Sequence, residues 1–282
     1  HDTVRKKKDG SLIPVSISAG PIVADGQTVG HVAVYKDISL LKKTEKELKE
    51  ALERLEIMNE KLQVVGGLTR HDARNKLSTI TGNVYLARKK LAGDSEALGC
   101  LGEMETAVQQ VVKIFDFART YEMLGVEGPA YVDVEKTIKE ATSLFSDLKG
   151  VKIINECHGL TVLADSLLRQ LFYNLVDNSL KYGQKITYVR VYYEKTGEDK
   201  LKLVYEDDGV GIPDSEKPNL FKEGYSSGGS TGHGLYLIKK MTEFYGWTIQ
   251  ETGAPHKGAQ FTITIPWKNQ NGEENYQLHW QT

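Results

Sequence analysis

Short strands separated by turns are predicted for the first 39 residues. Three strand-like segments cover residues 3–8, 11–24 and 28–39, and the Asp-Gly pairs between them are typical of tight turns. Three strands without a helix form only a thin core. We therefore expect residues 1–39 to be a small antiparallel sheet that completes a larger domain.

A seven-residue repeat of leucine dominates residues 40–65. Leu41, Leu48, Leu55 and Leu62 recur at this interval, the other positions are mostly polar, and the segment contains no Pro or Gly. Such a heptad seam favours a parallel two-stranded coiled coil. The alternative is one amphipathic helix that packs on its own domain.

A helical hairpin is predicted for residues 66–125. Gly66-Gly67 interrupts the leucine seam, and the apolar positions resume one residue out of phase at Leu77. After a loop around Gly93-Asp94, apolar residues return in strict 4-3 spacing over 97–118. Two helices with narrow apolar stripes bury both stripes best when the hairpin dimerises into a four-helix bundle.

Strands and helices alternate from residue 130 to 266. Strands are expected at 131–132, 152–155, 161–164, 185–195, 199–207, 247–252 and 259–266, and helices at 134–148, 166–182 and 233–245. Asp165 or Ser166 is the predicted cap of the second helix. This order indicates an α/β sandwich of mostly antiparallel sheet with helices on one face. The predicted fold class is therefore α+β, and residues 267–282 form a tail to which the pattern assigns no role.

Composition narrows the classes of protein. The 282 residues suffice for about two domains. The formal net charge of −2 argues against a broad nucleic-acid-binding surface. No apolar run is long enough to span a bilayer, so we expect no membrane contact from this segment. Cys100 and Cys157 lie far apart without a CxxC spacing, which is typical of a reduced, intracellular protein.

A polar stripe lies on the predicted helix 166–182. Asn174, Asp177, Asn178 and Lys181 fall within an arc of about 100° on this helix. Amide oxygens suit Mg²⁺, and an ammonium group suits phosphate. A solvated helix face is the alternative, although two Asn residues lower helix propensity.

Two glycine-containing segments follow. Asp207, Gly209 and Gly211 form D-x-G-x-G after a predicted strand, where the missing side chains let a ligand approach the backbone. Residues 224–234 hold five glycines just before a predicted helix, and the free N–H groups of a helix start can cradle phosphate. A plain turn and a flexible linker are the alternatives.

Together, these three segments resemble the N, G1 and G2 boxes of the ATP-binding domain of sensor histidine kinases. Residues 219–229, NLFKEGYSSGG, are similar to the F box of that domain, and residues 71–82, HDARNKLSTITG, resemble the phosphoacceptor motif H-[DE]-x-x-[NT]-x-L. The likeness extends from about residue 40 to 266. Residues 5–39 also resemble the last three strands of a PAS sensor domain.

The resemblance implies roles for the polar residues near the start of the hairpin. His71 would attack the γ-phosphate of ATP through one ring nitrogen, while Asp72 accepts a hydrogen bond from the other. The heptad register places His71 on the solvent side of the seam. Asn75 would orient a water that hydrolyses the phosphoaspartate of a response regulator, which implies a second, phosphatase activity.

The resemblance also implies a site for ATP and Mg²⁺ in the C-terminal domain. Asn174 and Asn178 would hold Mg²⁺, Lys181 would meet the phosphates, and Tyr182 would lie against the nucleotide. Asp207 would accept the adenine amino group, with Gly209 and Gly211 letting the ring come close. The triphosphate would be wrapped by Gly232, His233, Gly234 and Leu235, under a lid anchored by Phe221. The implied partners are a second copy of the chain and a response regulator.

Some positions depart from the family pattern. Lys76 stands where the family usually has Pro, Asp208 replaces the usual Asn, and Tyr236 replaces the last Gly of G-x-G-x-G. None of these changes removes a group that the chemistry requires. The remaining histidines have no partner at metal-like spacing and are predicted to be surface residues: His1, His31, His158, His256 and His279.

Two other functions fit part of the pattern. Gyrase, mismatch-repair and chaperone ATPases share the nucleotide fold but lack a phosphoacceptor helix before it. A degenerate kinase that only binds ATP or acts as a scaffold would lose residues such as Asn178 and Asp207, which are present. The expected location is the cytoplasm, where the chain would be a free protein or the cytoplasmic part of a membrane-anchored sensor.

Overall fold

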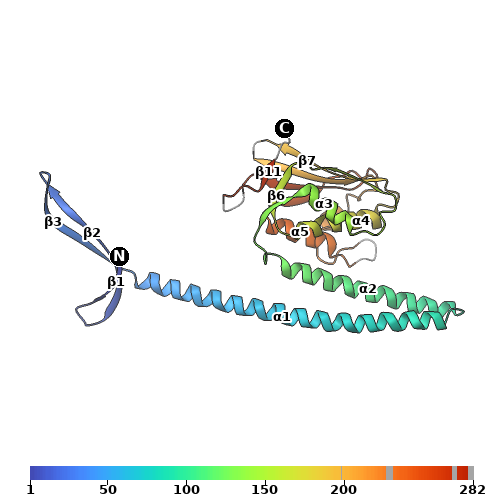
Figure 1. Cartoon of the computed structure of the whole chain (residues 1–282), viewed down its shortest axis with the longest axis horizontal. Coiled ribbons are helices and arrows are strands. Elements are labelled where there is room, and N and C mark those ends of the chain that lie inside the picture. Colours follow the sequence, from blue (N-terminus) through green and yellow to red (C-terminus); the bar gives the residue numbers. More distant parts are fainter. Residues whose placement is uncertain (198, 227–230, 269–271, 279–282) are drawn as a thin grey trace. The chain divides into compact units, whose positions relative to one another are not determined.

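The computed structural model describes residues 1–197, 199–226, 231–268 and 272–278. The chain divides into two compact units, His1–Thr69 and Arg70–Thr282. Figure 1 shows the elements in chain order. Within the described ranges no helix combines the length and the apolar character that crossing a membrane requires.

The first unit contains the predicted antiparallel sheet. Its strands are β1 (Asp2–Lys6), β2 (Leu12–Ala24) and β3 (Gln27–Asp37), paired in the order β1-β2-β3. The turn between β2 and β3 uses Asp25 and Gly26, which have φ of 48° and 76°, the left-handed region that Gly adopts without strain. The prediction of three strands is confirmed.

The helix α1 (Ser39–Lys90) is continuous over 52 residues and includes Gly66-Gly67. A helical Gly costs only about 1 kcal/mol relative to Ala, too little to end so long a helix. The predicted seam is uncovered within one chain: Leu48, Leu55 and Leu62 are 60%, 62% and 68% exposed. This exposure is what a coiled coil with a second chain would remove, so the dimer stays a prediction.

In the second unit, the end of α1 and α2 (Ser95–Met123) form the predicted hairpin. Asp94 caps α2, since its carboxylate accepts hydrogen bonds from the N–H groups of Glu96 and Ala97 at 3.1 and 3.0 Å. Ion pairs join the two helices at Arg70–Glu122, Arg74–Asp116 and Arg88–Glu105. Among the described side chains of the two helices only Val84, Leu101 and Val108 are buried. One hairpin therefore leaves most of its apolar stripe uncovered.

The C-terminal domain has the predicted sheet with helices on one side (Figure 1). Its five strands pair in the order β5-β7-β8-β10-β9, and only the β5–β7 pair is parallel. These strands are β5 (Lys152–Glu156), β7 (Tyr188–Thr196), β8 (Lys200–Asp207), β9 (Thr248–Glu251) and β10 (Gln260–Pro266). The covering helices are α3 (Val134–Ser143), α4 (Leu168–Tyr182) and α5 (Gly234–Phe244); a 3₁₀ turn, η1, spans Lys217–Asn219.

The apolar face of α4 lies at the centre of the core. Leu168, Leu171, Phe172 and Leu175 are at most 1% exposed. The predicted helix caps are wrong, because α4 begins at Leu168 and its N-cap residue Leu167 makes no side-chain cap bond. The carboxylate of Asp165 instead accepts from the N–H of Leu167 at 2.9 Å, before the first turn. Helix α3 is also shorter than predicted and ends at Ser143.

A second, three-stranded sheet contains part of the tail. Its order is β11-β6-β4, from β4 (Ala130–Asp133), β6 (Leu160–Ala164) and β11 (Tyr276–Leu278). Asn275 is buried and donates through Nδ2 to the carbonyl of Pro266 at 2.9 Å, while its own carbonyl accepts from Leu163 N at 2.7 Å. The tail was assigned no role by its sequence, yet residues 275–278 belong to the fold of this domain.

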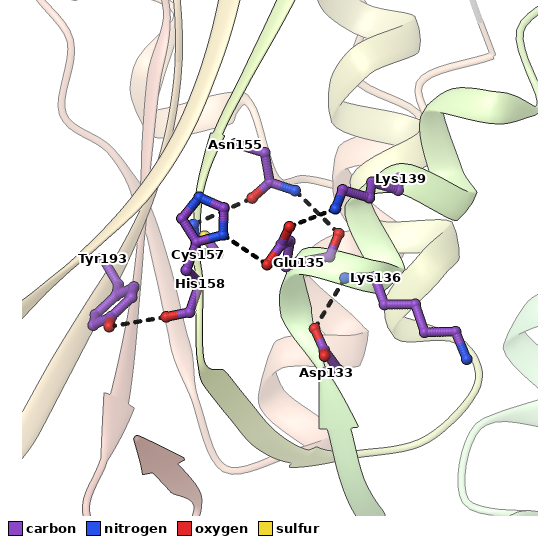
Figure 2. Close-up of polar contacts among 8 residues, drawn as sticks. All are labelled: Asp133, Glu135, Lys136, Lys139, Asn155, Cys157, His158 and Tyr193. Atoms are coloured by element: carbon purple, nitrogen blue, oxygen red, sulfur yellow. Dashed lines mark hydrogen bonds and ion pairs between the residues drawn. The ribbon is translucent and has the colours of Figure 1, made fainter. Parts of the chain in front are cut away.

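Polar contacts tie the start of α3 to the end of β5 (Figure 2). Glu135 accepts from Lys139 and lies 2.7 Å from Nδ1 of His158, and its carbonyl accepts from Asn155 Nδ2 at 3.0 Å. His158 is exposed, as predicted, but it is bonded on its Nδ1 side. His279 lies outside the described residues. This network fixes the edge of the sheet opposite to β9.

Candidate functional site

A cavity of about 390 Å³ opens beside the C-terminal half of α4. It is lined by α4, by the end of β8 and the loop that follows, by the segment before α5, and by β10. Its polar and glycine residues include Asn178, Ser179, Asp207, Gly211, Glu216, Gly232 and Gly234; its apolar residues include Val210, Ile212, Leu220, Leu235 and Phe261. Apolar walls with a few placed polar groups are typical of a site for a small molecule.

Asp207 lies at the buried end of this cavity and is 5% exposed. Its Oδ1 accepts hydrogen bonds from the main-chain N–H groups of Gly209 and Ala259, both at 3.0 Å. Its Oδ2 accepts from the hydroxyl of Ser179, which lies 2.9 Å from the hydroxyl of Tyr205. The predicted adenine acceptor is therefore held firmly, by two side chains that sequence reasoning missed.

The glycines around Asp207 make close contacts within the protein. A Cβ on Gly209 would lie 2.7 Å from the Cα of Gly183, and one on Gly211 would lie 2.9 Å from the carbonyl oxygen of Gly258. Gly258 has φ of +93°, and a Cβ there would overlap the carbonyl oxygen of Asp207 at 1.7 Å. These residues are Gly because backbone packs on backbone, and Gly183 and Gly258 were not predicted.

The polar stripe on α4 contains a buried amide nitrogen that is unpaired among the described residues. Asn174 Oδ1 accepts from Gln170 Nε2 at 2.9 Å, and Lys181 donates to Asp177 one turn away. The Nδ2 of Asn178 is buried without a hydrogen-bond partner among the described residues. An amide that the protein leaves unpaired in a cavity wall is consistent with a ligand site. The exposed Lys181 would have to leave Asp177 to meet a phosphate.

A second cavity of about 590 Å³ continues from this wall. It shares Asn178, Tyr182, Gly232 and Gly234 with the first cavity. Its other polar lining groups include Asn174, Lys181, His233, Arg169, Lys113 and Arg119. The cationic groups favour an anion, and the amides of Asn174 and Asn178 suit Mg²⁺ when phosphate oxygens supply further ligands. No cluster of three His, Cys, Asp or Glu side chains occurs in the described part of the chain.

The segment before α5 brings backbone N–H groups to both cavities. Helix α5 begins at Gly234. A Cβ on Gly234 would lie 4.0 Å from the Oδ1 of Asn178, so the lack of a side chain leaves this amide oxygen uncovered on that side. The first N–H groups of a helix have no partner within it and favour negative charge. A Cβ on Gly232 would lie 2.4 Å from the carbonyl carbon of Gly224, so only Gly fits where the backbone at 232 packs against the backbone at 224. Residues 227–230 of the glycine-rich segment lie outside the described residues.

Three other predicted residues occupy distinct places. His233 faces the second cavity, stacks on Phe117 at 4.6 Å between ring centroids, and has a buried Nδ1 without a partner in the described chain. Leu235 lines the first cavity. Phe221 packs edge-on against Phe261 at 6.3 Å and belongs to the margin of the core. The cavity wall at this point is formed by Leu220 and Tyr225.

His71 lies on the exposed side of α1, with its side chain 73% exposed. Its Nδ1 is 3.2 Å from Asp72 Oδ1 and 3.4 Å from Asn75 Nδ2. A carboxylate only accepts, so the contact with Asp72 requires a hydrogen on Nδ1 and leaves the lone pair on Nε2. With that hydrogen in place, Nδ1 is a donor, so only the oxygen of the Asn75 amide can bond to it. The oxygen and nitrogen of an amide can exchange places by a half-turn of the group, which brings the oxygen to this position.

The departures from the family pattern also have structural explanations. The carboxylate of Asp208 accepts from the N–H groups of Thr187 and Tyr188 at 2.8 and 3.1 Å, so it fixes the start of β7. Hydrogen bonds from both residues lower the pKa of Asp208 against the opposing effect of burial. Tyr236 lies 6.1 Å from Phe117 and beneath Lys240, on α5. α1 continues without a break at Lys76, where a Pro would remove a helical N–H.

Comparisons with known proteins indicate the family of this domain. Residues 164–269 match the family described as histidine kinase-, DNA gyrase B- and HSP90-like ATPases. The sensor protein KdpD of Clostridium acetobutylicum is 24% identical over 93% of this chain and 31% of its own length. A probable C4-dicarboxylate sensor kinase of Bacillus subtilis is 25% identical over 90% and 45%. The sensor histidine kinase ZraS of Klebsiella oxytoca is 26% identical over 82% and 52%.

Among solved structures, full-length ShkA in complex with AMPPNP has the same fold. Its TM-score is 0.53 at 20% identity, over 71% of this chain and 45% of that one. The C-terminal domain is thus an ATP-binding domain of the histidine kinase, gyrase and HSP90 type. The three curated relatives that match most of the chain are sensor kinases by name, and the chain is similar to them along 82–93% of its length. It spans between 31% and 52% of the length of the three curated relatives.

Proposed function

We propose that this chain phosphorylates His71 with ATP bound in the cavity of the C-terminal domain and passes the phosphoryl group to an aspartate of a response regulator. The observation that carries the proposal is the contact of Asp72 Oδ1 with His71 Nδ1 at 3.2 Å on an exposed helix face. A histidine with one nitrogen held by a carboxylate has its other nitrogen available as a nucleophile.

The chemistry follows from this hydrogen bond. Nε2 of His71 forms a bond to the γ-phosphorus, and the bond from that phosphorus to the bridging oxygen breaks, so ADP leaves with the electron pair. The imidazole gains positive charge in this step, and the carboxylate of Asp72 offsets it across the Nδ1 hydrogen bond. The exposure of His71 allows first a kinase domain and then a response regulator to reach the same atom.

ATP would lie with its adenine against Asp207 and its phosphates toward Gly234 and Asn178. Tyr182, which lines both cavities, would lie beside the nucleotide between its base and its phosphates. Asn174 and Asn178 would hold Mg²⁺, whose charge offsets that of the phosphates when it is bound. Lys181 would exchange Asp177 for a phosphate oxygen, a change that its exposed position permits.

Two variants separate the nucleophile from the nucleotide site. His71→Gln should abolish labelling by γ-labelled ATP but leave nucleotide binding unchanged, because His71 lines neither cavity. The wild-type label should be lost in acid and stable in base, as phosphohistidine is. Asn178→Ala should remove the Mg²⁺ dependence of nucleotide binding with little loss of fold. Label that persists on the His71→Gln variant would contradict the proposed acceptor.

We also propose that the protein dephosphorylates its response regulator. The support is the position of Asn75 one turn after His71, with its amide 3.4 Å from the ring. An amide can orient a water through both its oxygen and its nitrogen. Asn75→Ala should keep autophosphorylation and slow the decay of the phosphorylated regulator. Equal decay with both proteins would refute this activity and leave the kinase proposal intact.

The working form would be a homodimer. The leucine seam of residues 40–65 and the exposed stripe of the hairpin support this assembly, because a single chain leaves both uncovered. In this proposal residues 1–39 are part of a PAS-like sensor, residues 40–65 a coiled coil, residues 66–125 the phosphotransfer hairpin and residues 130–266 the catalytic domain. The chain would act in the cytoplasm, where response regulators are found.

A further inference from the structure

Two hydroxyl groups form a buried chain that ends on the Asp207 carboxylate. Tyr205 and Asp207 are two residues apart on β8, so their side chains point to the same face of the sheet. The hydroxyl of Tyr205 lies 2.9 Å from the Oγ of Ser179, and Ser179 donates to Asp207 Oδ2. Tyr205 and Ser179 are 1% and 4% exposed. Bulk water therefore does not compete for these hydrogen bonds.

The hydroxyl hydrogens of Tyr205 and Ser179 can be arranged in only one order. A carboxylate accepts hydrogen bonds, so Ser179 uses its single hydrogen on Asp207. The hydroxyl of Tyr205 must then donate to Ser179. Burial raises the pKa of Tyr205, which keeps this hydrogen in place. The order of donors is Tyr205, then Ser179, then the carboxylate.

The same contacts leave Asp207 one acceptor position. A carboxylate offers about four lone-pair positions. Oδ1 receives Gly209 N and Ala259 N, and Oδ2 receives Ser179 Oγ. The remaining position is on Oδ2, and Asp207 and Ser179 both line the cavity. A ligand in the cavity therefore meets an acceptor whose other positions are already filled by the protein.

We propose that Ser179 and Tyr205 are positioning residues that make this cavity select a purine with an amino group at C6 over a purine with a carbonyl group there. The inference rests on the proposed use of ATP and adds the residues that exclude GTP. A C6 amino group donates to Asp207 Oδ2, whereas a C6 carbonyl would face it with a second acceptor. Two acceptors that face each other leave both groups without a hydrogen-bond donor, which is the strongest basis for rejection.

Removal of Ser179 should weaken this rejection. Without the hydroxyl, Oδ2 has two open positions and a space beside it that a cavity water can enter. A water can accept from Tyr205 and donate to a C6 carbonyl, so it adapts to either base. The Ser179→Ala variant should therefore bind guanine nucleotides relatively better than the wild type does.

The test is the ratio of the affinities for ADP and GDP, measured by calorimetry on the full chain. Ser179→Ala should lower the preference for ADP by about tenfold, the scale of one hydrogen bond to a charged group. Tyr205→Phe should lower it in the same direction by a smaller factor, because it removes the donor behind Ser179. Loss of affinity for both nucleotides by the same factor would indicate a merely structural role.

Tyr245→Phe is the matched control. Tyr245 donates a buried hydrogen bond to Asp165 in the same domain, but neither residue lines either of the two cavities described above. This variant should melt at a lower temperature, but its ratio of affinities for ADP and GDP should equal that of the wild type. A wild-type chain that binds neither nucleotide would contradict the proposed function itself. A selective wild type with an unchanged ratio in Tyr205→Phe would overturn the inference, even if Ser179→Ala did not fold.

Discussion

Truncation of Tyr276 should strongly destabilise the ATP-binding domain, although Tyr276 lies in the tail. The side chain is 1% exposed, and its ring packs edge-on against Trp267 at 4.9 Å between centroids. Its backbone pairs with Val162 in β6. The Tyr276→Ala substitution would leave this pairing possible but remove the ring from the core.

The expected magnitude follows from burial. Replacement of a fully buried aromatic residue by Ala costs about 3–5 kcal/mol of unfolding free energy. In a domain of about 150 residues each kcal/mol shifts the melting temperature by about 2–4 °C, so the loss should be about 6–20 °C. The Tyr276→Phe variant is the matched control. The buried Oη has no hydrogen-bond partner in the described chain, so its removal should cost less than about 0.5 kcal/mol.

Tryptophan fluorescence of the full chain during heating measures this transition. The three tryptophans are Trp247, Trp267 and Trp280, and helix α1 contains none. Trp247 is buried in the core of this domain and Trp267 packs against it, so both report its unfolding. Added ADP should raise the midpoint temperature of this transition, and that shift would identify it as the unfolding of the ATP-binding domain. A Tyr276→Ala variant that melts within about 2 °C of the wild type would refute the assignment of the tail to the core.

Three further predictions concern thiols, acid stability and assembly. Burial raises the pKa of Cys157 to about 12, so a thiol reagent at pH 8 should modify the exposed Cys100 and spare Cys157 until the domain unfolds. Hydrogen bonds from Lys139 and His158 lower the pKa of Glu135, so its stabilising effect is present above the ordinary value of 4.5 and is lost as the pH falls through the lowered one. Glu135→Gln should therefore lower the melting temperature at pH 7, with a difference that disappears in acid. Leu55→Asp should shift sedimentation from dimer toward monomer, because it places a charge in the seam; Glu53→Asp, outside the seam, should leave the dimer unchanged.

Local periodicity predicted most of the fold. The apolar face of α4 and the strands of the five-stranded sheet follow from patterns of 3.6 and 2 residues, which depend on neighbouring residues only. The loop around Gly93-Asp94 likewise lies between two runs of helical apolar spacing. Such elements are encoded by short segments, so they are visible without knowledge of what they pack against.

Contacts between distant segments could not be predicted. β11 is three residues long and is a strand because it pairs with β6, more than 100 residues earlier. The chain of hydroxyls from Tyr205 through Ser179 to Asp207 joins β8 to α4, and neither hydroxyl residue stands out in its own segment. Gly258 could not be predicted either, because its close contact is with the backbone of Asp207, 51 residues earlier. The residues that could be predicted, such as Asp207, Asn178 and Gly234, belong to motifs that are readable in the sequence.

The arrangement of β4, β6 and β11 has a mechanical consequence. β4 is the first strand of the domain and β11 follows all its other strands; both pair antiparallel with β6, so they run in the same direction on either side of it. Tension between the entry to β4 and the exit from β11 pulls these two strands in opposite directions along β6. Such a load shears both ladders and strains their hydrogen bonds together, whereas a hairpin pulled from its open end would unzip one bond at a time. The domain should thus resist a force applied through its two chain ends better than one applied across its sheet.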